Sequence, residues 1–407
     1  MKVLGIIAEY NPFHNGHLYQ LEKSIDAIKP DFTIAIISGN FTQRGEAAFA
    51  SKWIRSKAAV KCGIDLVIEL PFVYACNNAE YFAKGAIKIL NGLGCVTHIS
   101  FGSECGDINA LTQVAKLLAD EPQPFKEALK QHLSEGLSYP KAREKAISQC
   151  LEDQYSDLAT SPNNILAIEY LKQLYLTNSD IKPFTVQRFI ADYHDTKLSG
   201  HIASATAIRK FFHTDDINKF MPKASFETFQ SADTSCCTDN ILYTLMCSKI
   251  LTTPAKDLAN IFSVREGLEN KIKEEVRFTK NLSELQTKLV SKRYTQTRIN
   301  RTLIHILFGL TTEKMHEADK ETPYARILSF NENGAKLIKH MKKNKLNEIP
   351  LITNVNKESE YLSTSKLLFS FDTASSDLFN LITSNDLYKG SDFVNKPFIQ
   401  KNFGKIT

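Results

Sequence analysis

Short apolar runs alternate with amphipathic stretches over the first hundred residues of the chain. The apolar runs predict buried strands, at residues 3–7, 32–37, 66–70 and 96–101. The stretches between them repeat apolar positions at helical spacing, at residues 17–28, 51–62 and 78–90. Strands this continuously apolar are typical of a parallel sheet with helices on both faces. The pattern therefore predicts an α/β fold with a Rossmann-like, doubly wound parallel sheet.

Beyond residue 100 the pattern is mainly helical. Residues 108–180 predict helices inserted into the α/β unit, and residues 185–189 predict one more strand. Residues 204–212 then predict a helix that starts at a serine cap.

A polar stretch near residues 220–238 marks the expected domain boundary, because long charged amphipathic segments follow it. We expect a catalytic α/β domain over residues 1–225 and a mostly helical, basic domain over residues 239–407. Within the second domain, residues 331–351 are compatible with a small α/β piece.

Composition narrows the class of protein without deciding its function. The 407 residues are 43% hydrophobic and 23% charged, which is typical of a globular protein. No apolar run is long enough for a transmembrane helix, so we expect no membrane association. The N-terminus runs directly into the first strand, which argues against a signal peptide. The eight cysteines include no C-x-x-C pair, so we expect free thiols in the cytoplasm rather than a zinc site or disulfides.

Positive charge is concentrated in the C-terminal part. Residues 241–407 carry a net charge of +8, whereas the whole chain carries +5. A basic module behind a near-neutral one suits a polyanionic partner such as nucleic acid. An ordinary lysine-rich surface would give the same excess, so charge alone leaves both interpretations open.

The strongest chemical signal is the sequence N-P-F-H-N-G-H at residues 11–17, directly after the first strand. A helix that starts there presents free N–H groups and the positive end of its dipole, which favour phosphate. His14 and His17 can donate hydrogen bonds to phosphate oxygens, and Gly16 lets the backbone approach a ligand closely. Two ordinary histidines at a helix start are the alternative, which the strand–loop–helix context disfavours.

A second motif, S-A-T-A-I-R-K, covers residues 204–210. The hydroxyls of Ser204 and Thr206 and the guanidinium of Arg209 could hold the tail of a triphosphate. A plain helix cap followed by solvated cations is the alternative. The two motifs together resemble the nucleotidylyltransferase and class I aminoacyl-tRNA synthetase superfamily.

Further motifs make the resemblance more specific. They follow one another in order, at residues 5–10, 38–46, 65–72, 101–104, 161–170 and 292–299. From residue 1 to about residue 390, the chain resembles the bacterial tRNA(Met) cytidine acetate ligase family. Ala48 departs from the family pattern, in which a proline is expected at this position.

The resemblance implies a two-step reaction. Acetate attacks the α-phosphate of ATP, giving acetyl-adenylate and pyrophosphate. The acetyl group then passes to the exocyclic amine of the wobble cytidine of elongator tRNA(Met), giving N4-acetylcytidine. Mg²⁺ is expected to arrive with ATP, and no protein ligand for it can be named.

The resemblance also assigns residues. The catalytic candidates are His14, His17 and Arg209. The ATP-binding candidates are Ile7, Ala8, Glu9, Tyr10, Asn11, Pro12, Phe13, His14, Asn15, Gly16, His17, Leu18, Tyr19, Gln20, Gly102, Asn163, Arg188, Ser204, Thr206 and Arg209. The candidates for a loop facing the acetyl-adenylate or the cytidine are Ser38, Gly39, Asn40 and Arg44. No residue can be assigned from the sequence as the base for the cytidine amine.

Basic residues in the helical part are candidates for RNA contact. The first cluster contains Lys288, Lys292, Arg293, Arg298 and Arg301, with Tyr294 available for stacking. The second contains Lys336, Lys339, Lys342, Lys343 and Lys345. Solvated helix faces remain the alternative for both clusters. A small-molecule adenylyltransferase and a non-catalytic RNA-binding protein remain alternative functions; the oligomeric state is unknown.

Overall fold

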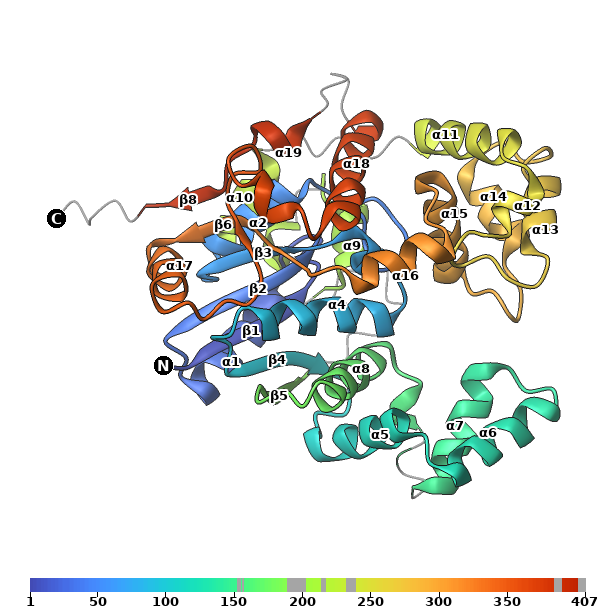
Figure 1. The fold of residues 1–407 in the computed structure, drawn as a ribbon, viewed down its shortest axis with the longest axis horizontal. Helices are drawn as coiled ribbons and strands as arrows, with labels where there is room; N and C mark the ends of the chain where they lie inside the picture. Colours follow the sequence, from blue (N-terminus) through green and yellow to red (C-terminus); the bar gives the residue numbers. More distant parts are fainter. Residues whose placement is uncertain are drawn as a thin grey trace.

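The computed structural model describes residues 1–151, 155, 157–188, 203–213, 217–231, 239–383 and 390–401. These residues form one sheet with helices on both of its faces (Figure 1). Its strands are β1 (Val3–Ala8), β2 (Phe32–Ser38), β3 (Leu66–Leu70), β4 (His98–Ser103), β5 (Lys182–Gln187), β6 (Ala325–Asn331), β7 (Leu351–Ile352) and β8 (Phe398–Gln400).

The strand order is β5-β4-β1-β2-β3-β6-β7, and β8 also pairs with β6. Strands β1 to β5 pair in parallel, as the apolar runs predict. The chain leaves β1 toward β2 on one side and later reaches β4 on the other side. Such a switch point opens a crevice at the carboxyl ends of the strands, where ligands bind in folds of this type.

Alternate residues of β1 face opposite sides of the sheet. Val3 and Ile7 belong to one buried cluster, which includes Ile87 of α4. Leu4 and Ile6 belong to another, which includes Leu21 of α1. Both faces are therefore covered, which explains why the strands are apolar at nearly every position.

The helices of the first half connect and cover the strands. They are α1 (Asn15–Ile28), α2 (Lys52–Lys61), α3 (Phe72–Ala75), α4 (Ala79–Gly92), α5 (Ile108–Asp120), α6 (Gln123–Ser134), α7 (Tyr139–Cys150), α8 (Pro162–Leu176), α9 (Ala205–Phe211) and α10 (Lys223–Gln230). Helix α1 begins two residues before the predicted start, because the His14 side chain caps it by accepting a hydrogen bond from the Gly16 N–H. Strand β5 begins at Lys182, earlier than predicted, and Phe189 lies outside the described residues.

The second half contains a helical lobe and a return to the sheet. Its helices are α11 (Asp239–Thr252), α12 (Ala255–Leu258), α13 (Leu268–Glu275), α14 (Leu282–Leu289), α15 (Gln296–Phe308), α16 (Thr312–Lys320), α17 (Glu332–Asn344), α18 (Lys366–Thr383) and α19 (Ser391–Val394). Helices α11 to α15 lie together at one end of the molecule, and α6 and α7 project near the same end (Figure 1).

The C-terminal part is less separate than the pattern predicts. Strand β6 pairs antiparallel with β3, opposing Arg326 to Glu69, and β7 and β8 extend this edge. Residues 325–331, 351–352 and 398–400 therefore belong to the sheet, and the helical lobe is confined to residues 239–320. The physical reason is that β3 would otherwise be an exposed edge with unpaired N–H and C=O groups.

Candidate active site

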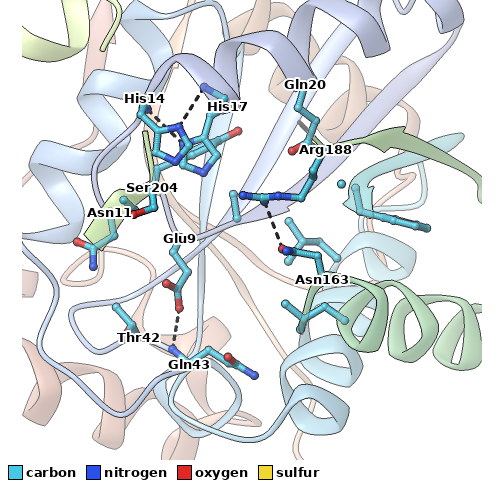
Figure 2. A pocket seen from close by; sticks show the side chains of 18 of the residues that line it. Glu9, Asn11, His14, His17, Gln20, Thr42, Gln43, Asn163, Arg188 and Ser204 are labelled. Carbon is cyan, nitrogen blue, oxygen red and sulfur yellow. Dashed lines mark hydrogen bonds between the residues drawn. The ribbon is translucent and has the colours of Figure 1, made fainter. Parts of the chain in front are cut away.

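A cavity of about 310 Å³ opens at the carboxyl ends of β1, β4 and β5 (Figure 2). It lies between the start of α1, the start of α8, α9 and the loop that follows β2. Most of the predicted nucleotide-binding residues line it: Ile7, Ala8, Glu9, Tyr10, Asn11, His14, Gly16, His17, Tyr19, Gln20, Gly102, Asn163, Arg188, Ser204, Thr206 and Arg209. The fold therefore brings both chemical motifs to one site.

The two histidines of the first motif are stacked at the start of α1. Their ring centroids are 3.8 Å apart, with 25° between the ring planes. His14 Nδ1 accepts a hydrogen bond from Gly16 N at 3.1 Å, and His17 Nδ1 accepts one from His14 N at 3.2 Å. Because each Nδ1 is an acceptor, each neutral ring carries its proton on Nε2. The backbone thus fixes the tautomer in which both rings can donate a hydrogen bond through Nε2.

Both rings are neutral at physiological pH. Burial, together with the positive charges of Arg188 and Arg209, lowers the pKa of His14 to about 3. Burial, His14 and Arg188 hold the pKa of His17 well below its usual range. The histidines can therefore act as hydrogen-bond donors to an anion, and they are poor candidates for proton donors at neutral pH.

The second motif lies on the same cavity wall as the first, and Figure 2 shows Ser204 beside the histidines. Ser204 caps α9 by accepting from Ala207 N at 3.1 Å. Arg209 Nη1 donates to Asn11 O at 2.9 Å, and its Nη2 lies 3.4 Å from the Thr206 hydroxyl. The Arg209 side chain is thereby held against the loop that precedes α1, so a cation and two hydroxyl-bearing residues face the same space as the histidines.

A third group of residues lies at the ends of β4 and β5 and at the start of α8. Arg188 Nη1 donates to Asn163 Oδ1 at 3.2 Å, as Figure 2 shows. Glu104 accepts from Asn163 N and Nδ2 and from Asn164 N at 2.7–3.1 Å. A Cβ at position 102 would lie 3.0 Å from Arg188 Cγ, so Gly102 leaves room for this arginine. Arg188 and Asn163 thus form one polar wall of the cavity.

Some predicted nucleotide residues do not line the cavity. Phe13 is fully buried in the core, and Leu18 packs against the same cluster. Asn15 turns toward Lys219, whose carbonyl oxygen accepts its side-chain N–H. Pro12 is also absent from the cavity wall. These four positions lie outside the cavity wall, and their assignment to the nucleotide stays a prediction.

The predicted substrate loop divides into two parts. Arg44 lines the cavity, whereas Ser38, Gly39 and Asn40 do not. Ser38 and Asn40 are buried, and the guanidinium of Arg55 donates to the backbone oxygens of Ser38 and Gly39. Residues 38–40 thus lie outside the cavity wall, where their polar groups hold the loop, and their role toward the substrate stays a prediction.

Sequence reasoning missed other residues of the cavity wall. They are Thr42, Gln43, Glu46, Phe82, Phe101, Glu104, Leu166, Tyr170, Val186, Gln187, Ala203 and Ala205. Gln43, Glu46, Phe101, Glu104 and Tyr170 lie within the motifs at residues 38–46, 101–104 and 161–170, so the motifs carried a signal for them. Phe82 lies on α4 and gave no signal beyond helical periodicity.

The first basic cluster surrounds the start of α15. Lys288 and Arg293 pair with Glu275 at 3.2 Å and Glu266 at 3.1 Å, while Lys292 is exposed. Tyr294 is buried, its hydroxyl donates to a backbone oxygen at 2.7 Å, and the Arg298 guanidinium lies 4.4 Å from its ring centroid. Its ring is thus part of the core, and its stacking on a base stays a prediction.

Arg301 differs from the other members of this cluster. Its Nη1 donates to Gln43 O at 3.0 Å, so it ties α15 to the cavity loop. The second cluster lies on α17, at the opposite end of the molecule from the helical lobe (Figure 1). There Lys339, Lys342 and Lys343 border a shallow apolar depression.

Within the described ranges, no group of three or more His, Cys, Asp or Glu side chains is placed to hold a metal ion. The same residues contain no helix with the length and apolar character needed to cross a membrane.

Comparison with known proteins identifies the family. A model of the HIGH nucleotidyl transferase family matches residues 1–392. A Thermoanaerobacter sp. protein, tRNA(Met) cytidine acetate ligase, is 43% identical over 405 residues, covering 97% of this chain and 98% of its own. The protein of the same name from Alkaliphilus metalliredigens is 41% identical, covering 98% and 99%. The chain belongs to the tRNA(Met) cytidine acetate ligase family.

Solved structures extend this relationship to the fold. The crystal structure of Thermotoga maritima TmcAL has a TM-score of 0.91 and 30% identity, over 98% of this chain and 100% of that one. A second structure of that protein, bound with alpha-thio ATP, has a TM-score of 0.90. Membership in the tRNA(Met) cytidine acetate ligase family confirms the resemblance and the α/β fold class drawn from the sequence.

Proposed function

We propose that this chain is an ATP-dependent acetate ligase that forms N4-acetylcytidine at the wobble position of elongator tRNA(Met). The observation that carries the proposal is the stacked, neutral histidine pair at the start of α1, which shares one cavity with Arg209. The names of the curated relatives and the nucleotide analogue bound by the Thermotoga maritima protein support it.

The geometry suits attack on the α-phosphate of ATP. His14 and His17 would donate their Nε2–H groups to the oxygens of this phosphate, which would lie at the positive end of the α1 dipole. As acetate oxygen bonds to phosphorus and the bond to pyrophosphate breaks, negative charge grows on these oxygens. Donors already held in place by the backbone stabilise that charge without reorganising.

The remaining walls divide the other parts of the nucleotide between them. Ser204, Thr206 and Arg209 would hold the β- and γ-phosphates, where a fixed cation also favours the leaving pyrophosphate. Gly102, Asn163 and Arg188 would receive the adenosine. Mg²⁺ would be carried by the phosphates and water, since hydroxyls and a cation make up this wall and magnesium needs few protein ligands.

The second step needs tRNA to reach the cavity. The exposed cations Lys288, Lys292 and Arg293 lie on the helical lobe, to which Arg301 ties the cavity loop. We propose that this lobe contacts tRNA phosphates, with Arg298 and Arg301 adding positive charge, and that the enzyme works in the cytoplasm where tRNA is modified. The apolar residues Phe82, Phe101 and Tyr170 give the cavity a restricted apolar part.

The function is tested by supplying ATP, carbon-labelled acetate and unmodified elongator tRNA(Met), and then digesting the tRNA. We expect labelled N4-acetylcytidine, no label without ATP, and a loss of about 10²–10³-fold in H17A. The matched control is H340A, because His340 is exposed on α17. An adenylylated small molecule without labelled nucleoside would favour a small-molecule adenylyltransferase. Bound tRNA without ATP turnover would favour an RNA-binding protein.

A further inference from the structure

The loop of residues 41–47 lies between the cavity and the helical lobe. It is closed by a bridge between Phe41 and Ala47 and by the bond from Thr42 N to Glu46 O at 2.9 Å. On one side, Gln43, Arg44 and Glu46 line the cavity. On its other side the loop meets α15, so it is the wall of the cavity nearest to the proposed tRNA-binding lobe.

The loop is fitted closely to α15. Arg301 Nη1 donates to Gln43 O at 3.0 Å, and Asn300 Nδ2 lies 3.4 Å from Glu46 Oε1. Gly45 has a φ of 75°, and a Cβ at this position would overlap the backbone of Arg301. Only glycine fits this turn without displacing α15. The position of Glu46 is therefore set by the helical lobe as well as by the sheet.

Two carboxylates line the cavity on this side, and they differ in setting. Glu9 lies at the end of β1, and its Oε1 accepts from Gln43 N at 2.8 Å. Glu46 lies at the junction with the lobe, with 45% of its side chain exposed and Oε2 4.0 Å from Arg209 Nη2. A nucleobase entering from the lobe would meet Glu46 before Glu9. Glu46 can also exchange a proton with water.

The acetyl-transfer step requires a proton acceptor. The two histidines are weak bases at neutral pH, because burial lowers their pKa values. The cytidine N4 attacks the acetyl carbon, the bond from that carbon to the AMP phosphate oxygen breaks, and N4 must lose one proton. We propose that Glu46 is the catalytic base that takes this proton and passes it to solvent. The inference rests on the proposed function and deepens it.

The charges around Glu46 suit this role. Burial raises the pKa of Glu46 above its usual range, opposed by Arg209 of α9 and by Arg44 of its own loop. Glu9, which follows β1, and Asp239 of α11 raise this pKa further, and α15 contributes the neutral Asn300. A carboxylate with a raised pKa is a stronger base, and a base works best when its pKa is near the working pH.

The test measures the two steps separately in one reaction. Enzyme in excess over tRNA is mixed with ATP and labelled acetate, stopped at short times, and analysed for labelled acetyl-adenylate and N4-acetylcytidine. In E46Q we expect the acetyl transfer to slow by about 10²-fold while the acetyl-adenylate forms within a few-fold of the wild-type rate and accumulates. E9Q makes the same chemical change on the other carboxylate and is the comparison.

The pH profile adds a second measurement. The wild-type transfer rate should rise with pH as Glu46 loses its proton and then level off, and E46Q should lose this rise. E46D, which keeps a carboxylate, should be slower than the wild type but keep the rise. Thermal unfolding of each variant checks that the fold is intact.

Three outcomes would overturn the assignment. Equal slowing of both steps in E46Q would mean that Glu46 acts by holding Arg209. A transfer-specific loss in E9Q and not in E46Q would assign the base to Glu9. Wild-type transfer in E46Q would exclude Glu46 altogether. Failure of the proposed function is distinct, because the wild-type enzyme would then form no N4-acetylcytidine.

Discussion

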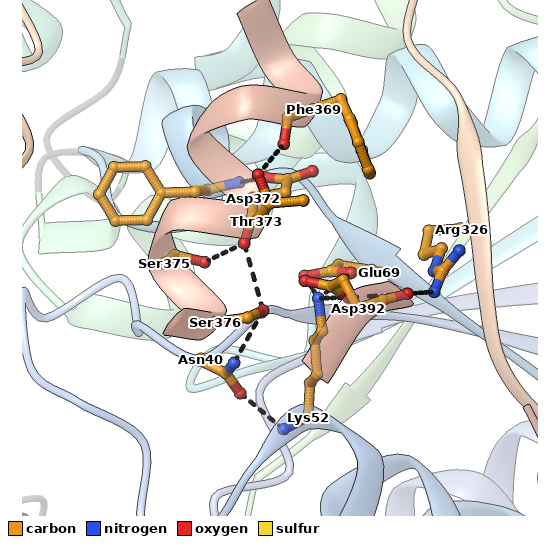
Figure 3. A network of polar contacts seen from close by, with 12 residues as sticks. Asn40, Lys52, Glu69, Arg326, Phe369, Asp372, Thr373, Ser375, Ser376 and Asp392 are labelled. Atoms are coloured by element: carbon orange, nitrogen blue, oxygen red, sulfur yellow. Dashed lines mark hydrogen bonds and ion pairs between the residues drawn. The ribbon is translucent and has the colours of Figure 1, made fainter. Parts of the chain in front are cut away.

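Two buried polar clusters lie along the same edge of the sheet and have opposite character. At the end of β1, His14 and His17 are neutral and face a cavity. Beside the end of β3, Lys52 is fully buried, with Nζ 2.7 Å from Glu69 Oε2 and 2.8 Å from Asp392 Oδ1 (Figure 3). The first cluster, which we call the open cluster, offers uncharged hydrogen-bond donors. The second, which we call the sealed cluster, pairs a buried cation with buried carboxylates.

The difference follows from what covers each cluster. The carboxylates Asp392 and Glu69 raise the pKa of Lys52 above its usual value, although burial alone would lower it. Helices α18 and α19 close over this site, and Asn40 links it to the loop after β2 by accepting from Lys52 N and donating to Ser376. A sealed charge must be paired by the protein itself, whereas an open cavity can leave donors for a ligand. A cluster of buried polar side chains therefore indicates a binding site only where a cavity lies next to it.

The sharpest test of this contrast removes the cation from the sealed cluster. Lys52→Met leaves Glu69 and Asp392 buried without their partner, so the free energy of unfolding should fall by about 3–5 kcal/mol. Urea unfolding followed by the fluorescence of Trp53, the single tryptophan, measures it. Lys61→Met, at the exposed end of α2, should cost less than about 1 kcal/mol. Equal stability of both variants would show that the cluster is not a charged anchor.

The same substitution in the open cluster should have the opposite effect. Arg209 lies on the cavity wall with 22% of its side chain exposed, so Arg209→Met leaves no sealed charge behind. We expect the rate of acetyl-adenylate formation to fall by about 10²–10³-fold, equivalent to about 3–4 kcal/mol, with unfolding free energy changed by less than about 1 kcal/mol. Lys210→Met, on the neighbouring exposed residue, is the control. A loss of stability matching that of Lys52→Met would remove the distinction between the clusters.

The contrast also explains how far the sequence could predict the molecule. Strands β1 to β5 and the H-x-G-H loop were predictable because periodicity and motif spacing are local signals. The pairing of β6 with β3 was not, since Glu69 and Arg326 are brought opposite one another by tertiary contact alone. No local sequence signal determines which two apolar strands pair with each other in the sheet.

The candidate site was predictable to a similar extent, and what the sequence left open again depends on tertiary contacts. Ser38 and Asn40 belong to a motif at a strand end, yet they serve the sealed cluster and its supports. Tyr294 lies in a basic segment, and only the packing around it shows that its ring belongs to the core. Glu46 lies within the motif at residues 38–46, but its proposed role depends on contacts with Arg209 and Asn300, which lie far away along the chain.

The smallest expected effect concerns the pH dependence of stability, and it isolates the open cluster. Burial lowers the pKa of His14 to about 3, whereas an unfolded histidine titrates near 6.5. Between these values the unfolded chain binds a proton that the folded chain does not. The stability contributed by the neutral ring is therefore complete above about pH 6.5 and is lost as the pH falls toward about 3.

His14→Asn removes the titration while keeping a side-chain oxygen that can cap α1. For each proton bound only by the unfolded chain, the unfolding free energy falls by about 1.4 kcal/mol per pH unit. The variant should therefore lose about 2 kcal/mol less than the wild type between about pH 7 and about pH 5, because most of the proton uptake lies below about pH 6.5. Urea unfolding at both pH values gives this difference, and the same pair at about pH 8 gives the cost of the substitution itself. Parallel losses in the two proteins would mean that the pKa of His14 in the folded chain is close to its unfolded value of about 6.5, and the pair would then gain a positive charge below that pH.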